Sequence, residues 1–240
     1  MLVHGAWHGA WSWERVIADL GPTGLPVVAI DLPGHGGDDR DLTDLHGDAQ
    51  HVREVLDTVP GAVVLVGHSY GGAVITEAGV HERVRHLVYV TAFAIDETES
   101  CVSAAASNPS AAAISHDGRP DITAGLVIDA DGRVTLERGV AAACFFNDCD
   151  AESTAWALDR LGPQLLTSLQ QSPTAVAWRS TPSTYAVCAL DMTVHPDLQG
   201  LLAPRCSASV EWPTSHSPFL SRPDLVAGLI AEVAAEVRTG

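Results

Sequence analysis

The fold is decided by the stretch Gly61-Ala62-Val63-Val64-Leu65-Val66-Gly67-His68-Ser69-Tyr70-Gly71-Gly72-Ala73-Val74. Its first half, Ala62 to Val66, is a short apolar run that predicts a buried strand, and the run from Ala73 to Ala78 predicts a helix. Between them, Gly67-x-Ser69-x-Gly71 puts a serine on a turn whose glycines let the helix pass close to the strand. The helix N-terminus favours developing negative charge, so Ser69 is predicted to be a nucleophile.

Length and composition predict a single globular domain. The chain has 240 residues, of which 46% are hydrophobic, enough for one sizeable core. The net charge of −17 argues against nucleic acid or an anionic membrane as a partner, because both would repel the protein. No apolar run approaches the roughly 18 residues of a membrane span and no leader pattern is present, so a cytoplasmic location is expected.

Cysteine usage points to free thiols in a reducing compartment. The five cysteines are odd in number and lack C-x-x-C spacing. A pairing of Cys144 with Cys149 stays open at this stage.

Strands and helices are predicted to alternate along both ends of the chain. Apolar strands are expected at residues 1–3, 26–30, 62–66, 84–90, 185–190 and 208–212, and helices at 12–20, 51–59, 73–78, 196–202 and from Pro223 onward. Ser12 is a candidate N-cap of the first helix, and residues 38–48 are expected to form an acidic loop. This alternation predicts an α/β fold with a mostly parallel sheet covered by helices on both faces.

The alternation breaks between about residues 94 and 180, which are rich in Ala, Ser, Asp and Gly. Two short apolar runs flanking Asp131-Gly132 predict a hairpin, and residues 144–148 and 155–166 are expected to be helical. An insertion of this length is best interpreted as a lid on the same domain. Its aromatic residues either line a pocket or form the core of the lid (Phe145, Phe146, Trp156 and Trp178).

A nucleophilic serine needs a base to take its proton and a third group to orient that base. His216 follows the strand at 208–212, at the edge of the sheet where Ser69 is expected, whereas His195 precedes Pro196 as a helix cap or surface residue. Asp191 follows the preceding strand and is the predicted acid. Asp197 is expected on a helix, facing solvent.

Hydrolysis also needs N–H donors for the oxyanion. One is predicted from Tyr70, and the other from Ala6 in the glycine-bearing loop after the first strand, a loop that could also be a simple tight turn. His4 and His8 are spaced like metal ligands, but they lie on a glycine loop without a nearby third ligand. We therefore expect no metal and no cofactor.

Four motifs together carry a resemblance to a known family: His4-Gly5-Ala6-Trp7-His8-Gly9-Ala10-Trp11-Ser12-Trp13, Asp31-Leu32-Pro33-Gly34-His35-Gly36, Gly67-His68-Ser69-Tyr70-Gly71-Gly72 and His216-Ser217-Pro218-Phe219. With them the chain resembles the α/β-hydrolases over essentially its whole length, most of all the branch of plant methyl esterases, hydroxynitrile lyases and bacterial esterases. The resemblance implies Ser69, Asp191 and His216 as a triad with Ala6 and Tyr70 as oxyanion donors. It also implies a lid over the site and a tendency to form homodimers.

The expected function is that of a carboxylesterase acting through an acyl-enzyme on small to medium, fairly apolar esters. The expected partner is thus a small-molecule ester, with His8, Phe146 and Trp156 as candidate substrate contacts. The alternatives are a lyase that cleaves cyanohydrins with the same triad, and a ligand-binding receptor on a hydrolase fold. The lyases of this branch carry Lys after the catalytic histidine and Thr after the first loop's leading histidine. Ser217 and Gly5 stand there instead and favour ester hydrolysis.

Overall fold

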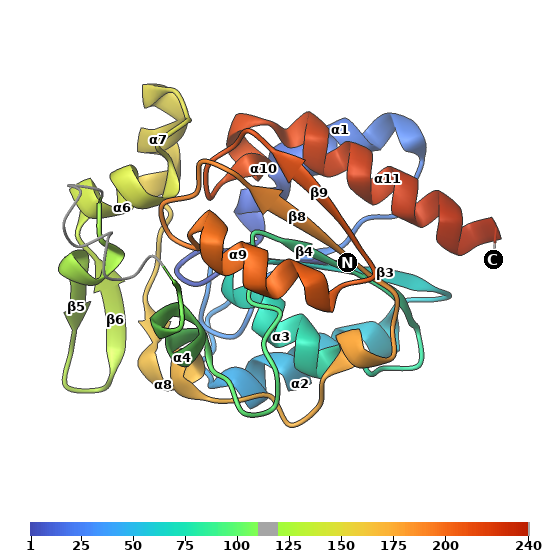
Figure 1. Cartoon of the computed structure of the whole chain (residues 1–240), viewed down its shortest axis with the longest axis horizontal. Helices are drawn as coiled ribbons and strands as arrows, with labels where there is room; N and C mark the ends of the chain where they lie inside the picture. The colour runs from blue at the N-terminus through green and yellow to red at the C-terminus, as the bar shows by residue number, and fades with distance from the viewer. Residues whose placement is uncertain (110–119, 240) are drawn as a thin grey trace.

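The main sheet is parallel, as the alternation of strands and helices predicts. The computed structural model describes residues 1–109 and 120–239, and within these ranges six strands pair in the order β2-β1-β3-β4-β8-β9 (Figure 1). The strands are β1 (Leu2–Val3), β2 (Ala29–Ile30), β3 (Val63–His68), β4 (Val84–Val90), β8 (Ser183–Cys188) and β9 (Ala208–Trp212). Because all pairs are parallel, the residues that follow the strands meet at one edge.

Helices cover both faces of this sheet (Figure 1). On one face α1 (Glu14–Leu20) packs along α11 (Pro223–Thr239), whose buried residues Val226, Leu229, Ile230 and Val233 recur at helical spacing. On the other face α2 (Leu45–Thr58) packs against α3 (Tyr70–Ala78). The shorter helices are α9 (Pro196–Leu202), α10 (Pro218–Ser221) and the 3-10 turns Ala10–Trp13, Gly21–Thr23, Ile122–Gly125, Ala177–Arg179 and Ala203–Arg205.

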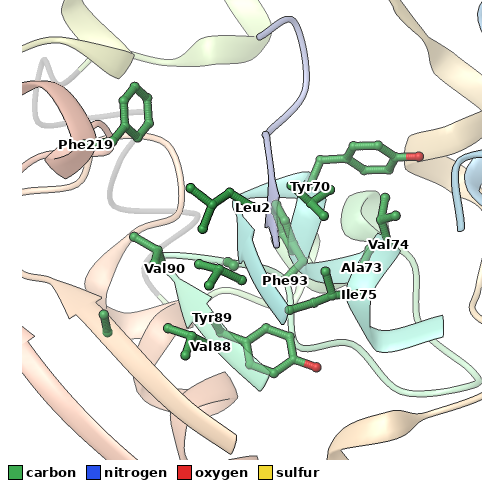
Figure 2. Close-up of a cluster of buried hydrophobic side chains, with 14 of the residues drawn as sticks. Leu2, Tyr70, Ala73, Val74, Ile75, Val88, Tyr89, Val90, Phe93 and Phe219 are labelled. Carbon is green, nitrogen blue, oxygen red and sulfur yellow. The ribbon is translucent and has the colours of Figure 1, made fainter. Parts of the chain in front are cut away.

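The core lies between β3, β4 and α3, around the turn that carries Ser69. Figure 2 shows side chains of β1, α3 and β4 gathered into one apolar cluster, to which Phe219 of α10 is added. Every residue of α3 is buried, which explains why its sequence is apolar nearly all round. The turn before α3 is therefore held between two buried elements, β3 and α3.

Residues between β4 and β8 form an insertion with its own small antiparallel sheet. Its strands are β5 (Leu126–Ile128), β6 (Arg133–Leu136) and β7 (Gln164–Leu165), and its helices are α4 (Cys101–Ala106), α6 (Arg138–Phe145), α7 (Ala151–Leu158) and α8 (Leu166–Gln170). β5, β6, α6 and α7 stand together at one end of the main sheet (Figure 1). Gly132 has a φ of +77° in the predicted hairpin turn. Residues 110–119 of the predicted lid lie outside the described residues.

Several predicted boundaries are wrong. The helix expected at 51–59 begins at Leu45, because Asp44 accepts a hydrogen bond from the Gly47 N–H at 2.9 Å and so caps it within the expected loop. The strand expected at 26–30 spans only Ala29–Ile30. Ser12 lies in a 3-10 turn and donates to the Gly9 carbonyl instead of capping α1.

Three further boundaries differ in the second half of the chain. The helix expected at 155–166 ends at Leu158, and its last residues form β7. The helix expected at 144–148 is the end of α6, which stops at Phe145. The strand expected at 185–190 stops at Cys188.

All five cysteines are free thiols, so Cys144 and Cys149 are not bridged. Among the helices of the described part of the chain, none is both long and apolar enough to cross a membrane.

Candidate active site

Ser69 follows β3 with a φ of +52°, a left-handed conformation that costs a serine about 1–3 kcal/mol. Backbone hydrogen bonds hold it there. Its N–H donates to the Val90 carbonyl at 3.3 Å, and its carbonyl accepts from Gly72 at 2.9 Å and Phe93 at 3.1 Å. Such strain, held by the surrounding structure, is typical of a functional turn.

The flanking glycines are required by close approach. A Cβ at Gly67 would lie 2.5 Å from the Gly71 carbonyl oxygen, and a Cβ at Gly71 would lie 2.5 Å from the His4 carbonyl oxygen. The turn from β3 into α3 (residues 67–72, here called the elbow) therefore touches the loop after β1. In that loop Gly5, the residue before Ala6, approaches Ser69 so closely that a Cβ there would lie 2.9 Å from the Ser69 Cβ.

Asp191 and His216 form a buried hydrogen-bonded pair. Asp191 lies three residues beyond β8 and His216 four residues beyond β9, and each is 1% exposed. The His216 Nδ1 lies 2.7 Å from the Asp191 Oδ2. The other carboxylate oxygen accepts N–H bonds from Thr193 at 2.6 Å and Val194 at 2.9 Å, so the carboxylate cannot rotate freely.

Thr91 is a third member of this group that the sequence reasoning missed. It is the first residue after β4, has a φ of +41°, and donates its hydroxyl to the same Oδ2 that faces His216. A pattern was available to find it. Because β4 pairs with β8, a hydroxyl residue directly after β4 reaches the edge where Asp191 lies.

His68 and Asp148, also missed, hold the loop of His216. The His68 Nε2 donates to the His216 carbonyl at 2.8 Å, so the residue before Ser69 is bonded to the backbone of the predicted base. Asp148 of the insertion accepts the Ser215 N–H at 2.8 Å and also the Ser215 hydroxyl. These bonds reach across the chain, so no local sequence pattern marks them.

The candidate substrate contacts are only partly brought together. The His8 ring lies 5.4 Å from that of Phe145 and 6.1 Å from that of Phe146. Trp156 lies farther out, with its ring 5.3 Å from that of Trp11, which in turn stacks on His8.

Burial keeps the histidines around the site neutral. Desolvation lowers the pKa of His8 to about 3 and lowers the pKa of His68 far below its ordinary value. The His68 ring lies 4.7 Å from the His216 ring, so this neighbour brings no positive charge to the predicted base.

The site is closed over in this conformation. Ser69 is 6% exposed, and the Phe145 ring stacks on His216 with centroids 5.5 Å apart. A cavity of about 300 Å³ lies elsewhere, among Met1, Val63 and Ile230 at the amino ends of β1 and β3.

The loop histidines are engaged by the backbone. In His4 the Nδ1 lies 2.8 Å from the Gly5 carbonyl oxygen, and the Nε2 accepts the Leu32 N–H at 3.0 Å. Within residues 1–109 and 120–239, no group of three or more His, Cys, Asp or Glu side chains is arranged to hold a metal ion.

Comparison with known proteins identifies relatives. The sequence pattern of the alpha/beta hydrolase family matches residues 1–229. The alpha/beta hydrolase nvfD of Aspergillus novofumigatus is 27% identical over 98% of this chain and 96% of its own length. Methylesterase 2 of Arabidopsis thaliana is 38% identical over 42% of this chain and 41% of its own length.

A solved structure shares the fold. A pyrethroid hydrolase from Sphingobium faniae JZ-2 superposes with a TM-score of 0.81 at 24% identity, covering 98% of this chain and 96% of that one. The predicted fold class, with its parallel sheet and inserted segment, is thereby confirmed.

Proposed function

We propose that the chain, which belongs to the alpha/beta hydrolase family and to its methylesterase-like branch, is a serine carboxylesterase. Its substrates would be small to medium, fairly apolar esters cleaved through an acyl-enzyme. The observation that carries the proposal is the buried Asp191–His216 pair, in which the His216 carbonyl accepts a hydrogen bond from the ring of His68, the residue that precedes Ser69.

The first half of the reaction follows from this arrangement. The Ser69 Oγ attacks the ester carbonyl while the His216 Nε2 takes the serine proton. The His216 Nδ1–H donates to Asp191, which stabilises the imidazolium as it forms. His216 then gives the proton to the departing alkoxide, and the alcohol leaves.

The second half repeats these steps with water. His216 takes a proton from the water, whose oxygen attacks the acyl carbon on Ser69, and returns it to the serine as the acid departs. In both halves the negative oxygen would be stabilised by the N–H groups of Ala6 and Tyr70. Tyr70 opens α3, so the helix dipole adds to that stabilisation.

The surroundings of the site favour an apolar substrate. The rings of Phe145 and Phe146 lie against the neutral His8, and these side chains would contact the acyl or alcohol group of the substrate. Among the similar proteins, one is named as a methylesterase and another as a pyrethroid hydrolase.

Two positions favour hydrolysis over cyanohydrin cleavage. Departing cyanide would need a cation beside the base, but Ser217 follows His216 and burial leaves His68 neutral. A Cβ at Gly5 would lie 2.7 Å from the His68 Nδ1 and 2.9 Å from the Ser69 Cβ. The threonine of the lyases would therefore displace His68 in this chain.

The test is a panel of p-nitrophenyl and methyl esters with acyl chains of increasing length, assayed with the wild type and Ser69→Ala. Wild-type turnover should be highest for short and medium acyl chains, and Ser69→Ala should retain less than about 0.1% of it because the nucleophile is gone. Mandelonitrile is the matched substrate for the lyase. Cyanide release at a rate comparable to the best ester, or turnover of a few per cent in Ser69→Ala, would refute the proposal.

A further inference from the structure

Trp7 adopts a conformation that its sequence does not explain. Its φ is +64°, in the left-handed region that bulky residues avoid, and it directly follows Ala6, a proposed oxyanion donor. The peptide between Ala6 and Trp7 is held at its carbonyl, which accepts from the His8 Nδ1 at 2.7 Å. The direction of the Ala6 backbone therefore depends on how Trp7 is held.

Three bonds from the insertion hold Trp7. The indole Nε1 donates to the Val134 carbonyl of β6 at 2.9 Å, and the Trp7 carbonyl accepts the Gly162 N–H at 2.8 Å. The Trp7 N–H donates to the Gln164 Oε1 at a longer distance, 3.4 Å. One residue of the loop after β1 is thus fixed through its backbone N–H, its backbone carbonyl and its side chain.

Gln164 also contacts a second loop. It is fully buried on β7, and its Oε1 also lies 2.9 Å from the His35 Nε2. Its amide group donates to the Ser168 hydroxyl at 2.6 Å, so the side chain has no freedom to turn. The His35 ring in turn lies 5.1 Å from that of His4, at the start of the loop that carries Ala6.

We propose that the small antiparallel sheet of the insertion positions the oxyanion hole, with Trp7 and Gln164 as the positioning residues. The inference rests on the proposed function, because it assumes that the Ala6 N–H stabilises the reacting oxygen. Neither residue touches the ester. Both act through the backbone of Ala6, whose N–H is aimed correctly only while β6 and β7 are docked against the loop.

The test uses two variants with matched controls. Trp7→Phe removes the indole N–H, and its control is Trp13→Phe, which loses the same ring volume at a buried indole whose N–H has no partner. Gln164→Met removes the buried amide, and its control is Gln171→Met, because Gln171 of the insertion bonds to Asp44 and Leu45 at the start of α2.

The readout compares an oxygen ester with the thionoester of the same acid. Sulfur is larger and a weaker acceptor, so a thionoester gains little from a well-placed oxyanion hole. Trp7→Phe and Gln164→Met should lower kcat on the oxygen ester about tenfold with KM nearly unchanged, and lower the oxygen-to-thiono rate ratio by a similar factor. The control variants should keep the wild-type ratio.

An unchanged oxygen-to-thiono ratio in both variants, which means equal losses on the two esters, would overturn the positioning role. The Gln164 variant keeps the test valid if Trp7→Phe does not fold. A wild type without ester turnover would overturn the proposed function, and this inference with it. An active wild type whose variants keep its ratio would overturn the inference alone.

Discussion

At the scale of single residues, the carboxylate of Asp191 is held at both oxygens before any substrate arrives. Two backbone N–H groups bind Oδ1, and the Thr91 hydroxyl shares Oδ2 with His216. A buried carboxylate with these bonds stays oriented without reorganising during the reaction. Its proposed role as the orienting acid can be tested by comparing the activity of variants at Asp191 and Asp197.

Asp191→Asn should lower kcat by about 10⁴-fold, because an amide favours the wrong tautomer of His216. Asp197→Asn is the control, since Asp197 lies on α9 with its side chain half exposed. Steady-state kinetics on one p-nitrophenyl ester measures both. The reverse ranking would mean that the acid is misassigned.

Thr91→Val keeps the branched shape at the strained position after β4 but removes the hydroxyl that donates to Asp191. The loss of one bond to a charged group should lower kcat/KM about tenfold. Thr91→Ser retains the hydroxyl and should stay within about threefold of the wild type. Equal losses in the two variants would show that the side-chain volume matters and the hydrogen bond does not.

At the scale of elements, the sequence predicts those that carry a strong local pattern. β4, α9 and β9 have the predicted bounds, because apolar strands bounded by turns and a helix opened by Pro196 are local features. The predictions fail where long-range contacts determine the secondary structure. The two-residue β7 exists only because Gln164 pairs beside Val134 of β6.

In the candidate site, too, local patterns can be predicted from the sequence and long-range contacts cannot. Ser69, Asp191 and His216 could be named because chain order and strand ends are readable in the sequence. The bonds from His68 and Asp148 could not, because they join residues 148 and 67 positions apart, whereas Thr91 could have been named from its place directly after a strand. Trp7 and Gln164 are separated by 157 positions.

The contact between α2 and α3 predicts a dependence of stability on pH. Asp48 is fully buried on α2 and accepts hydroxyl bonds from Tyr70 at 2.6 Å and Thr43 at 2.5 Å. Burial raises the pKa of Asp48 to about 7 from 3.8, so the folded state holds a proton that the unfolded chain releases. This stabilisation is complete below about pH 4 and is lost as the pH rises through 7.

Asp48→Asn is the variant that tests this, because the amide cannot ionise. The free energy of unfolding of the wild type relative to Asp48→Asn should fall by about 2–3 kcal/mol between pH 5 and pH 8. Urea unfolding followed by tryptophan fluorescence at each pH gives the difference. A difference that is constant across this range would show that Asp48 is ionised throughout in the folded protein.

At the scale of the whole molecule, the parallel sheet brings three distant segments to one edge. Ser69 follows β3, Asp191 follows β8 and His216 follows β9, while the inserted segment bonds to the loops around them. The whole chain has a net charge of −17, which suits a neutral ester better than an anionic one. The central claim is that this edge is a serine esterase site built on Ser69.

The most direct measurement is the site and stoichiometry of labelling by a fluorophosphonate, followed together with the loss of ester turnover. One equivalent of label on the peptide that contains Ser69 should abolish turnover completely, and Asp191→Asn should be labelled far more slowly under the same conditions. Loss of turnover with the label on another residue, or full turnover in protein fully labelled at Ser69, would contradict the account.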